Sequence, residues 1–206
     1  MIARLNRLRR DLSGATIVEF GFVAPVMCVL IMGLGDLLHQ VYAQSVLNGE
    51  VQKAARDSGI EGGATSTATI DAKVVRRMLP VVKNLSNSCA ADSTGAVWCS
   101  TRRSYDNFTE IRPEPFTDAD DDDIRDPGEC FTDQNGNRLW DEDPGIVGQG
   151  GAGAATSYTM NITYPHIFPV MGLLGWSSRQ TITATTVLKN QPYATQTEIA
   201  DVKVCT

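Results

Sequence analysis

A short stretch near the N-terminus, Ser13-Gly14-Ala15-Thr16-Ile17-Val18-Glu19-Phe20, determines the architecture of the chain. An apolar run of 22 residues, 17–38, begins inside it and follows a leader with four arginines. A bilayer span takes about 20 such residues, whereas the core of a signal peptide has only about 7–15. Glu19 interrupts the run, and a carboxylate within a membrane span costs about 2.5–3.5 kcal/mol. Glu19 therefore needs a partner, which a cut after Gly14 would create by freeing the amine of Ala15.

A glycine followed by four residues and then Glu-Phe is similar to the processing site of type IV prepilins. Together with Val23-Ala24-Pro25, the motif from Gly14 to Phe20 resembles the TadE-like pseudopilins of tight-adherence (Flp-type) pilus systems. The resemblance implies that a prepilin peptidase cuts between Gly14 and Ala15 and leaves 206 − 14 = 192 residues. It also implies that Glu19 pairs with the new amine, on its own or a neighbouring subunit, and sets the register of assembly.

The same resemblance implies a minor pilin or assembly factor whose partners are other pilins, the inner-membrane assembly platform and lipid. Because positive charge before a span stays in the cytoplasm, the chain should cross the bacterial inner membrane once, with its C-terminal head in the periplasm or carried into an extracellular pilus. Two alternatives remain open. The segment would otherwise be a removed signal or an uncleaved anchor, and the latter would make the chain a permanently anchored periplasmic or surface protein for calcium binding or adhesion.

The remaining periodicity predicts an α+β chain. We expect a basic leader at residues 1–14, a transmembrane and stalk helix at 15–57, and an exported head at 58–206 with an acidic two-copy insertion at 116–145. Within the head, a helix is expected at 69–79 and a short strand at 96–99. Period-two patterns at 158–164 and 182–188 predict two antiparallel strands. The apolar connection between them, 166–176, is either folded under the sheet or exposed for docking to a membrane or another subunit.

Charge and motif content narrow the functional class. The formal net charge is −6, and residues 114–145 hold twelve acids against two arginines, so this one segment carries the acidity. Such a segment disfavours nucleic acid as a partner. The chain has two histidines, and no spacing gives either a nucleophile partner, nor is there a phosphate-binding glycine loop. We therefore expect no enzymatic activity.

Five cysteines suit an exported protein. Cys28 lies in the apolar run, and the other four follow it. Four cysteines allow three pairings. We favour Cys89 with Cys99, because a turn sequence separates them, which leaves Cys130 to pair with Cys205.

The acidic segment repeats with a period of 15 residues, since 116–126 aligns with 131–141. Both copies alternate oxygen-bearing side chains as a calcium loop does. In the first copy the expected ligands are Asp118, Asp120, Asp122, the carbonyl of Ile124, Asp126 and Glu129. In the second they are Asp133, Asn135, Asn137 and Asp141, with Asp143 replacing the missing acid at position twelve.

Both copies depart from an EF-hand. Position six, normally glycine, is Asp123 in one copy and Arg138 in the other, and prolines crowd the places where helices would flank the loops. The segment is therefore more similar to stand-alone calcium repeats of extracellular proteins. The alternative is a solvated acidic linker that binds no metal.

Overall fold

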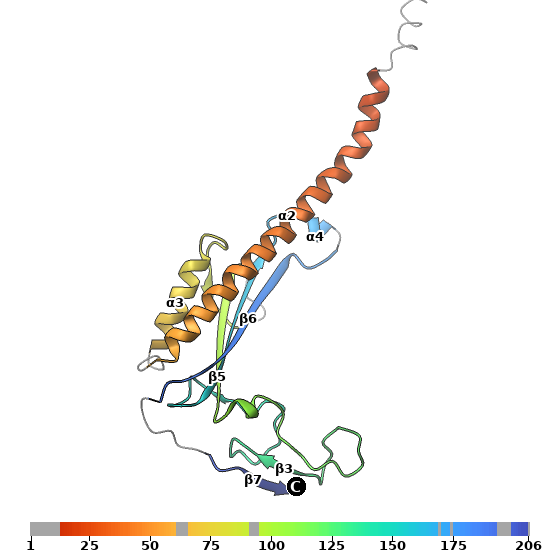
Figure 1. The fold of residues 1–206 in the computed structure, drawn as a ribbon. Coiled ribbons are helices and arrows are strands. Elements are labelled where there is room, and N and C mark those ends of the chain that lie inside the picture. Colours follow the sequence, from red (N-terminus) through yellow and green to blue (C-terminus); the bar gives the residue numbers. More distant parts are fainter. Residues whose placement is uncertain are drawn as a thin grey trace, which may run out of the picture. The chain divides into compact units, whose positions relative to one another are not determined.

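The computed structural model describes residues 13–60, 66–90, 95–168, 170–173, 175–192 and 199–205. Most of the predicted basic leader lies outside these residues. The elements in chain order are α2 (Ser13–Ser58), α3 (Thr67–Met78), β1 (Ser86–Asn87), β2 (Val97–Tyr105), the 3-10 helix η2 (Phe108–Glu110), β3 (Cys130–Asp133), β4 (Ile146–Val147), β5 (Ala155–Pro165), α4 (Val170–Leu173), β6 (Arg179–Lys189) and β7 (Val202–Cys205) (Figure 1).

The chain divides into two compact units. The helical unit consists of α2 up to Tyr42 together with Pro165–Gln180, and the sheet unit consists of Ala43–Tyr164 with Thr181–Thr206. A long N-terminal apolar helix followed by a mixed sheet confirms the predicted α+β class.

In the helical unit, α2 continues without a break through Pro25. Its apolar side chains between Ile17 and Leu38 are mostly exposed all around the helix. Among the described residues, α2 is the one helix whose length and composition suit a membrane crossing, within Ile17–Ser58. A helix with no polar face is stable where its surroundings are as apolar as its surface.

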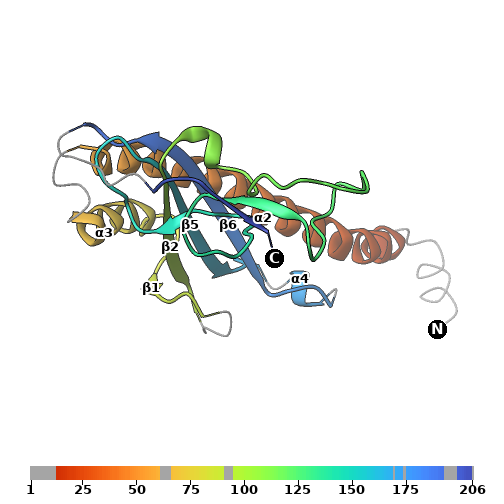
Figure 2. The ribbon, with the colours of Figure 1, turned by 90° about the horizontal axis from the view of Figure 1, so that it is seen from below.

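The sheet unit contains a sheet of order β1-β2-β5-β6, with β4 also paired to β2. β2 and β5 are antiparallel, with Val97 opposite Thr163 and Tyr105 opposite Ala155. β1 is parallel to β2. Threonine side chains bond across β5 and β6 in reversed order, Thr159 with Thr185 and Thr163 with Thr181, which indicates an antiparallel pair. Figure 2 shows β2, β5 and β6 side by side.

One face of this sheet is covered by helices. Every second residue of β5 points into the core, and α2 and α3 supply the opposite layer. The buried residues are Ala43, Leu47, Val51, Ile70, Val74, Met78, Tyr158, Met160, Ile162, Tyr164, Ile182 and Ala184. The predicted period-two patterns therefore mark the strand residues that build the core.

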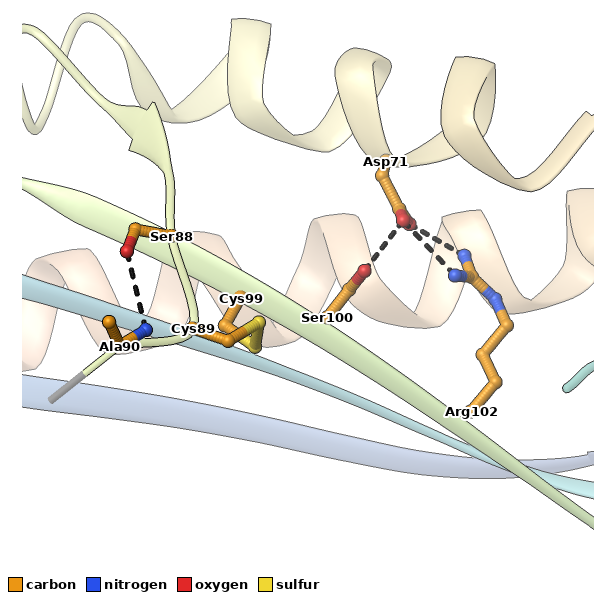
Figure 3. Close-up of a disulfide and its surroundings, with 7 residues drawn as sticks. All are labelled: Asp71, Ser88, Cys89, Ala90, Cys99, Ser100 and Arg102. Atoms are coloured by element: carbon orange, nitrogen blue, oxygen red, sulfur yellow. Dashed lines mark hydrogen bonds and ion pairs between the residues drawn. A yellow bond between two sulfur atoms is a disulfide. The ribbon is translucent and has the colours of Figure 1, made fainter. Parts of the chain in front are cut away.

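A buried ion pair fixes α3 to the sheet. Asp71 of α3 accepts hydrogen bonds from Arg102 at 2.6 Å, Ser100 at 2.7 Å and Tyr158 at 2.7 Å. Burial alone would raise the pKa of Asp71, but these bonds outweigh it and hold the pKa below its usual value. Figure 3 shows Asp71 above Ser100 and Arg102, near the disulfide that joins Cys89 to Cys99.

Candidate functional site

The acidic segment is organised by a short antiparallel pairing of its two repeats. Phe116 and Phe131 face each other in an isolated bridge. On either side of it, the amide of Thr117 donates to Cys130 at 2.7 Å and the amide of Thr132 donates to Pro115 at 2.8 Å. Phe116 and Phe131, which are 15 residues apart in sequence, thus become partners, and one loop follows each of them.

The first acid of each loop makes the same hydrogen bonds within its loop. Asp118 accepts the amides of Asp121 at 2.7 Å and Asp123 at 2.9 Å, one on each carboxylate oxygen. Asp133 accepts the amides three and five residues ahead, those of Gly136 and Arg138, both at 2.7 Å. In each loop the first acid therefore holds the backbone of the following five residues in a turn.

Position six of each loop adopts the backbone conformation that glycine normally provides. Asp123 has φ 61° and Arg138 has φ 64°, both in the left-handed region. The glycine missing from both copies is therefore replaced by residues in the same conformation, at the modest cost that a left-handed non-glycine residue carries.

A glutamate closes each loop. Glu129, position twelve of the first loop, accepts the amides of Ala119 at 2.7 Å and Asp126 at 2.9 Å, at both ends of that loop. Glu114 accepts the corresponding amides of the second loop, as described next. Glu114 lies four residues before the first loop, so the second loop is closed by a residue from outside it.

Glu114 was not among the residues expected from sequence. Its carboxylate accepts the amides of Gln134 at 2.8 Å and Asp141 at 3.1 Å, and its side chain is 1% exposed. Burial raises its pKa, and the nearby carboxylates of Asp133 and Asp141 add to the increase. The signal that would have found it is the 15-residue period, since Glu114 precedes Glu129 by one repeat.

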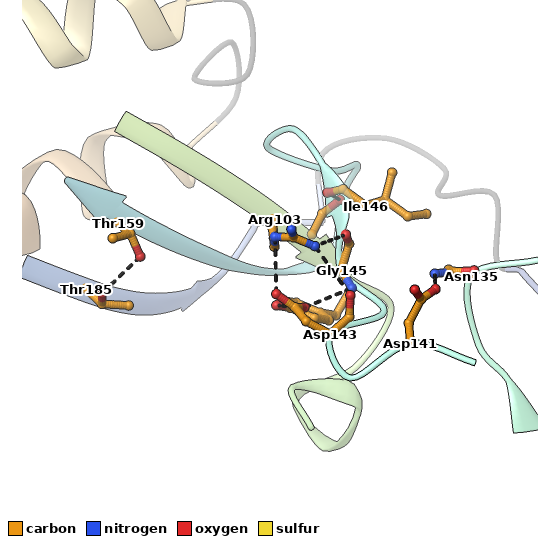
Figure 4. Close-up of polar contacts among 10 residues, drawn as sticks. Arg103, Asn135, Asp141, Asp143, Gly145, Ile146, Thr159 and Thr185 are labelled. Carbon is orange, nitrogen blue, oxygen red and sulfur yellow. Dashed lines mark hydrogen bonds and ion pairs between the residues drawn. The ribbon is translucent and has the colours of Figure 1, made fainter. Parts of the chain in front are cut away.

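Asp143, the residue expected to close the second loop, lies elsewhere. Its carboxylate pairs with Arg103 at 3.1 Å, accepts the hydroxyl of Tyr105 at 2.8 Å and accepts the amide of Gly145 at 3.1 Å (Figure 4). Burial and this bond raise the pKa of Tyr105 to about 12. Asp143 therefore contacts β2 and not the second loop.

The remaining predicted ligands lie inside the loops. In the first loop, carboxylate oxygens of Asp118, Asp120 and Glu129, and of Asp120, Asp122 and Asp126, come within 4.8 Å of one another. The amide of Ile124 donates to Asp122 at 2.8 Å. In the second loop, the side-chain amides of Asn135 and Asn137 donate to Asp141 at 2.7 Å and 2.6 Å. The first loop is thus richer in negative charge.

In the first loop, the pKa values of two neighbouring acids are shifted in opposite directions. The backbone amide of Asp123 is the main cause that keeps the pKa of Asp118 below its usual value. Repulsion from Asp122 raises the pKa of Asp120 instead. A cation between these carboxylates would relieve that repulsion.

The segment is also packed and cross-linked. Trp140 donates its indole N–H to the carbonyl of Glu114 at 2.8 Å, and Phe116 packs edge-on against it with ring centroids 6.1 Å apart. A disulfide joins Cys130 to Cys205 and so ties β3 to β7. Both disulfides of the structure have the pairing that was favoured from sequence.

The predicted processing segment lies in α2, which is described from Ser13 onward. The bond between Gly14 and Ala15 is therefore within the helix. Glu19 and Phe20 follow on the same helix, and both are exposed. The helix therefore presents an acid and an aromatic ring on its surface a short distance after that bond.

Comparison with protein-family models matches residues 14–56 to the family described as TadE-like protein. This segment is similar to TadE-like proteins. The match confirms the resemblance expected from the motif. The TadE-like segment starts at Gly14 and ends two residues before α2 does, so it contains both the apolar run and the part of the helix that packs on the sheet. No curated protein and no solved structure matches the chain.

Proposed function

We propose that the protein is a minor pilin or pseudopilin that acts in assembly of a Flp-type pilus. The observation that carries this proposal is that the TadE-like match begins at Gly14, the glycine of the processing motif, and continues along α2 to residue 56. The long apolar helix supports a membrane-held component with a structural role.

In this proposal a prepilin peptidase cuts the bond between Gly14 and Ala15 on the cytoplasmic side, and the head lies in the periplasm. Glu19 then lies four residues from a new N-terminal amine, one turn along the helix. An exposed carboxylate on an apolar helix is costly in lipid. Pairing with the amine of its own or a neighbouring subunit removes that cost and selects one register between helices.

The processing step is tested by intact mass and N-terminal sequencing of the membrane-extracted protein, produced with and without a prepilin peptidase. A start at Ala15 only when the peptidase is present is the expected result. Gly14→Leu should block the cut, while Gly21→Leu is a matched control, since a side chain added at Gly21 meets no atom within 4 Å. A start at Met1 with active peptidase would overturn the proposal and favour the permanently anchored protein.

The second part of the proposal is structural calcium in the acidic segment. It is supported by the matched hydrogen bonds, the left-handed position six and the closing glutamate of each loop. The first site would use Asp118, Asp120, Asp122, the Ile124 carbonyl, Asp126 and Glu129. The second would use Asp133, Asn135, Asn137 and Asp141, with Glu114 in place of Asp143. Calcium would hold the loops in shape by bridging oxygens from residues far apart in sequence.

Calcium binding is tested by titration calorimetry of the full chain in detergent. We expect binding that Asp118→Ala with Asp133→Ala abolishes. Glu114→Gln should weaken the second site, and Asp143→Asn should leave both sites unchanged. If calcium produces neither heat nor a change in thermal stability, the metal proposal is wrong and the segment is a cross-linked acidic structure. If Asp143→Asn weakens binding and Glu114→Gln does not, the assignment of the closing residue is wrong.

A further inference from the structure

The connection between β5 and β6 is the most apolar segment outside α2. Residues 165–180 contain no acid, no lysine and one arginine, Arg179. Within the segment, Ile167 is 53% exposed and Trp176 is 66% exposed. Two large apolar side chains on the surface of one short segment indicate a contact that the isolated chain does not satisfy.

This segment is fixed to α2. Asp36, which is 2% exposed, accepts the backbone amides of Ile167 at 3.0 Å and Phe168 at 3.4 Å. The ring nitrogen Nδ1 of His166 lies 3.6 Å from the other carboxylate oxygen. These three consecutive residues therefore hold the segment to one position on the helix.

The segment makes a second contact with α2, at the residue before Asp36. The ring of Phe168 approaches Gly35 so closely that an added Cβ would lie 3.2 Å from its Cε2 atom. Glycine at this position allows the ring to rest on the helix backbone. The segment is thus held by a polar contact and an apolar contact at adjacent residues of α2.

The position of Asp36 along α2 gives the depth in a membrane at which the segment is attached. Asp36 lies 19 residues after Ile17, the start of the apolar run, which is about 28 Å along a helix that rises about 1.5 Å per residue. The hydrocarbon core of a bilayer is about 30 Å thick. If α2 spans the membrane, Asp36 lies close to the outer boundary of the hydrocarbon, and the attached segment lies at the same level.

We propose that residues 165–180 dock on the lipid of the same membrane that α2 crosses, with Trp176 and Ile167 entering the boundary between headgroups and acyl chains. Tryptophan is enriched at this boundary, where its ring is partly solvated and partly in hydrocarbon. The absence of acids from the segment suits a surface of anionic headgroups. The proposal also gives Asp36 a role, because its Oδ1 atom accepts both amides and so positions the segment. It rests on the membrane span of the proposed function.

The test uses the full chain in phosphatidylcholine–phosphatidylglycerol vesicles that contain lipids brominated either near the headgroup or near the end of the acyl chain. Bromine quenches tryptophan only at short range. We expect shallow bromine to quench more than deep bromine, and Trp176→Phe to remove most of that shallow quenching. Trp98→Phe, in the sheet, is the matched control and should keep it. Asp36→Ala should reduce the quenching of Trp176, whereas Glu19→Ala, an acid of the same helix, should not.

Flotation of the same vesicles separates this proposal from the one on which it rests. If the protein does not float with lipid, the membrane span itself is wrong, and the docking proposal fails with it. If the protein floats and Trp176 is unquenched by lipid but open to aqueous iodide, only the docking proposal is overturned. If Trp176 is unquenched by lipid and shielded from iodide, the segment binds protein, such as a second copy of this chain, and the lipid proposal is likewise overturned.

Discussion

Replacing Glu114 with alanine should open the second acidic loop while the rest of the protein stays folded. The substitution leaves two backbone amides, those of Gln134 and Asp141, without their acceptor. A hydrogen bond to a charged group contributes about 1.5–3 kcal/mol, so two contribute about 3–6 kcal/mol. Part of this loss is offset, because the substitution also removes a carboxylate whose charged form is disfavoured by burial, as its raised pKa indicates. We therefore expect the free energy of opening the loop to fall by about 2–4 kcal/mol.

Native-state amide hydrogen exchange of the full chain in detergent, without calcium, measures this directly. Because about 1.4 kcal/mol is tenfold in an equilibrium constant, the amides of Gln134 and Asp141 should exchange about 30 to 900 times faster. Glu142→Ala, an exposed neighbour with the same change of charge, is the control and should leave both amides protected. Equal exchange in the two variants would refute the role of Glu114. Faster exchange of these amides in Asp143→Ala would return that role to Asp143.

Three further outcomes follow from the described contacts. Asp71→Ala leaves Arg102 buried and unpaired, so it should lower the free energy of unfolding, measured in denaturant, by about 3–5 kcal/mol. Asp57→Ala, which removes an exposed pair with Lys73, is the control and should lower it by about 0–1 kcal/mol. The pKa of Glu114 is higher in the folded protein than its ordinary value of 4.5. Without calcium, the stabilisation of the second loop by protonated Glu114 is therefore complete below pH 4.5 and is lost as the pH rises through the higher folded value. Protection of the loop amides from hydrogen exchange, corrected for intrinsic exchange rates, should fall over that pH window. Gly150→Ala, at φ 72° and with its new Cβ 2.6 Å from a serine Cβ of β2, should lower the melting temperature more than Gly148→Ala, which meets nothing within 4 Å.

The elements that could be predicted are those whose pattern is local. The apolar run, the helix observed at Thr67–Met78 and the alternation along β5 and β6 each depend on residues a few positions apart. β2 was predicted only for residues 96–99, yet it extends to Tyr105. Its second half is polar, and Arg102 there is buried only because Asp71, 31 residues earlier, pairs with it. No window of the sequence contains both partners, so the burial of a charge could not be foreseen.

The closing residue of the second loop shows a different limit of prediction from sequence. Reading a calcium loop forward from its first acid leads to position twelve, which is Pro144, and then to the nearest acid, Asp143. The repeat identifies Glu114 as the counterpart of Glu129, but only the antiparallel pairing reveals that Glu114 closes the second loop, whereas Glu129 closes the loop in which it is position twelve. The place of Glu114 beside the second loop is a property of the pairing, which local spacing does not reveal.

The closing hydrogen bonds explain how a segment with so many acids can be ordered. The second loop is closed by Glu114, which lies outside it, so its order depends on the chain that precedes the first loop. The disulfide between Cys130 and Cys205 closes a separation of 75 residues, and a constraint of that length is worth about 4 kcal/mol. Backbone amides donate hydrogen bonds to Asp118, Asp133 and the two glutamates, while Asp120 keeps a pKa raised by Asp122. That remaining repulsion is the physical reason to expect that a divalent cation would tighten the first loop.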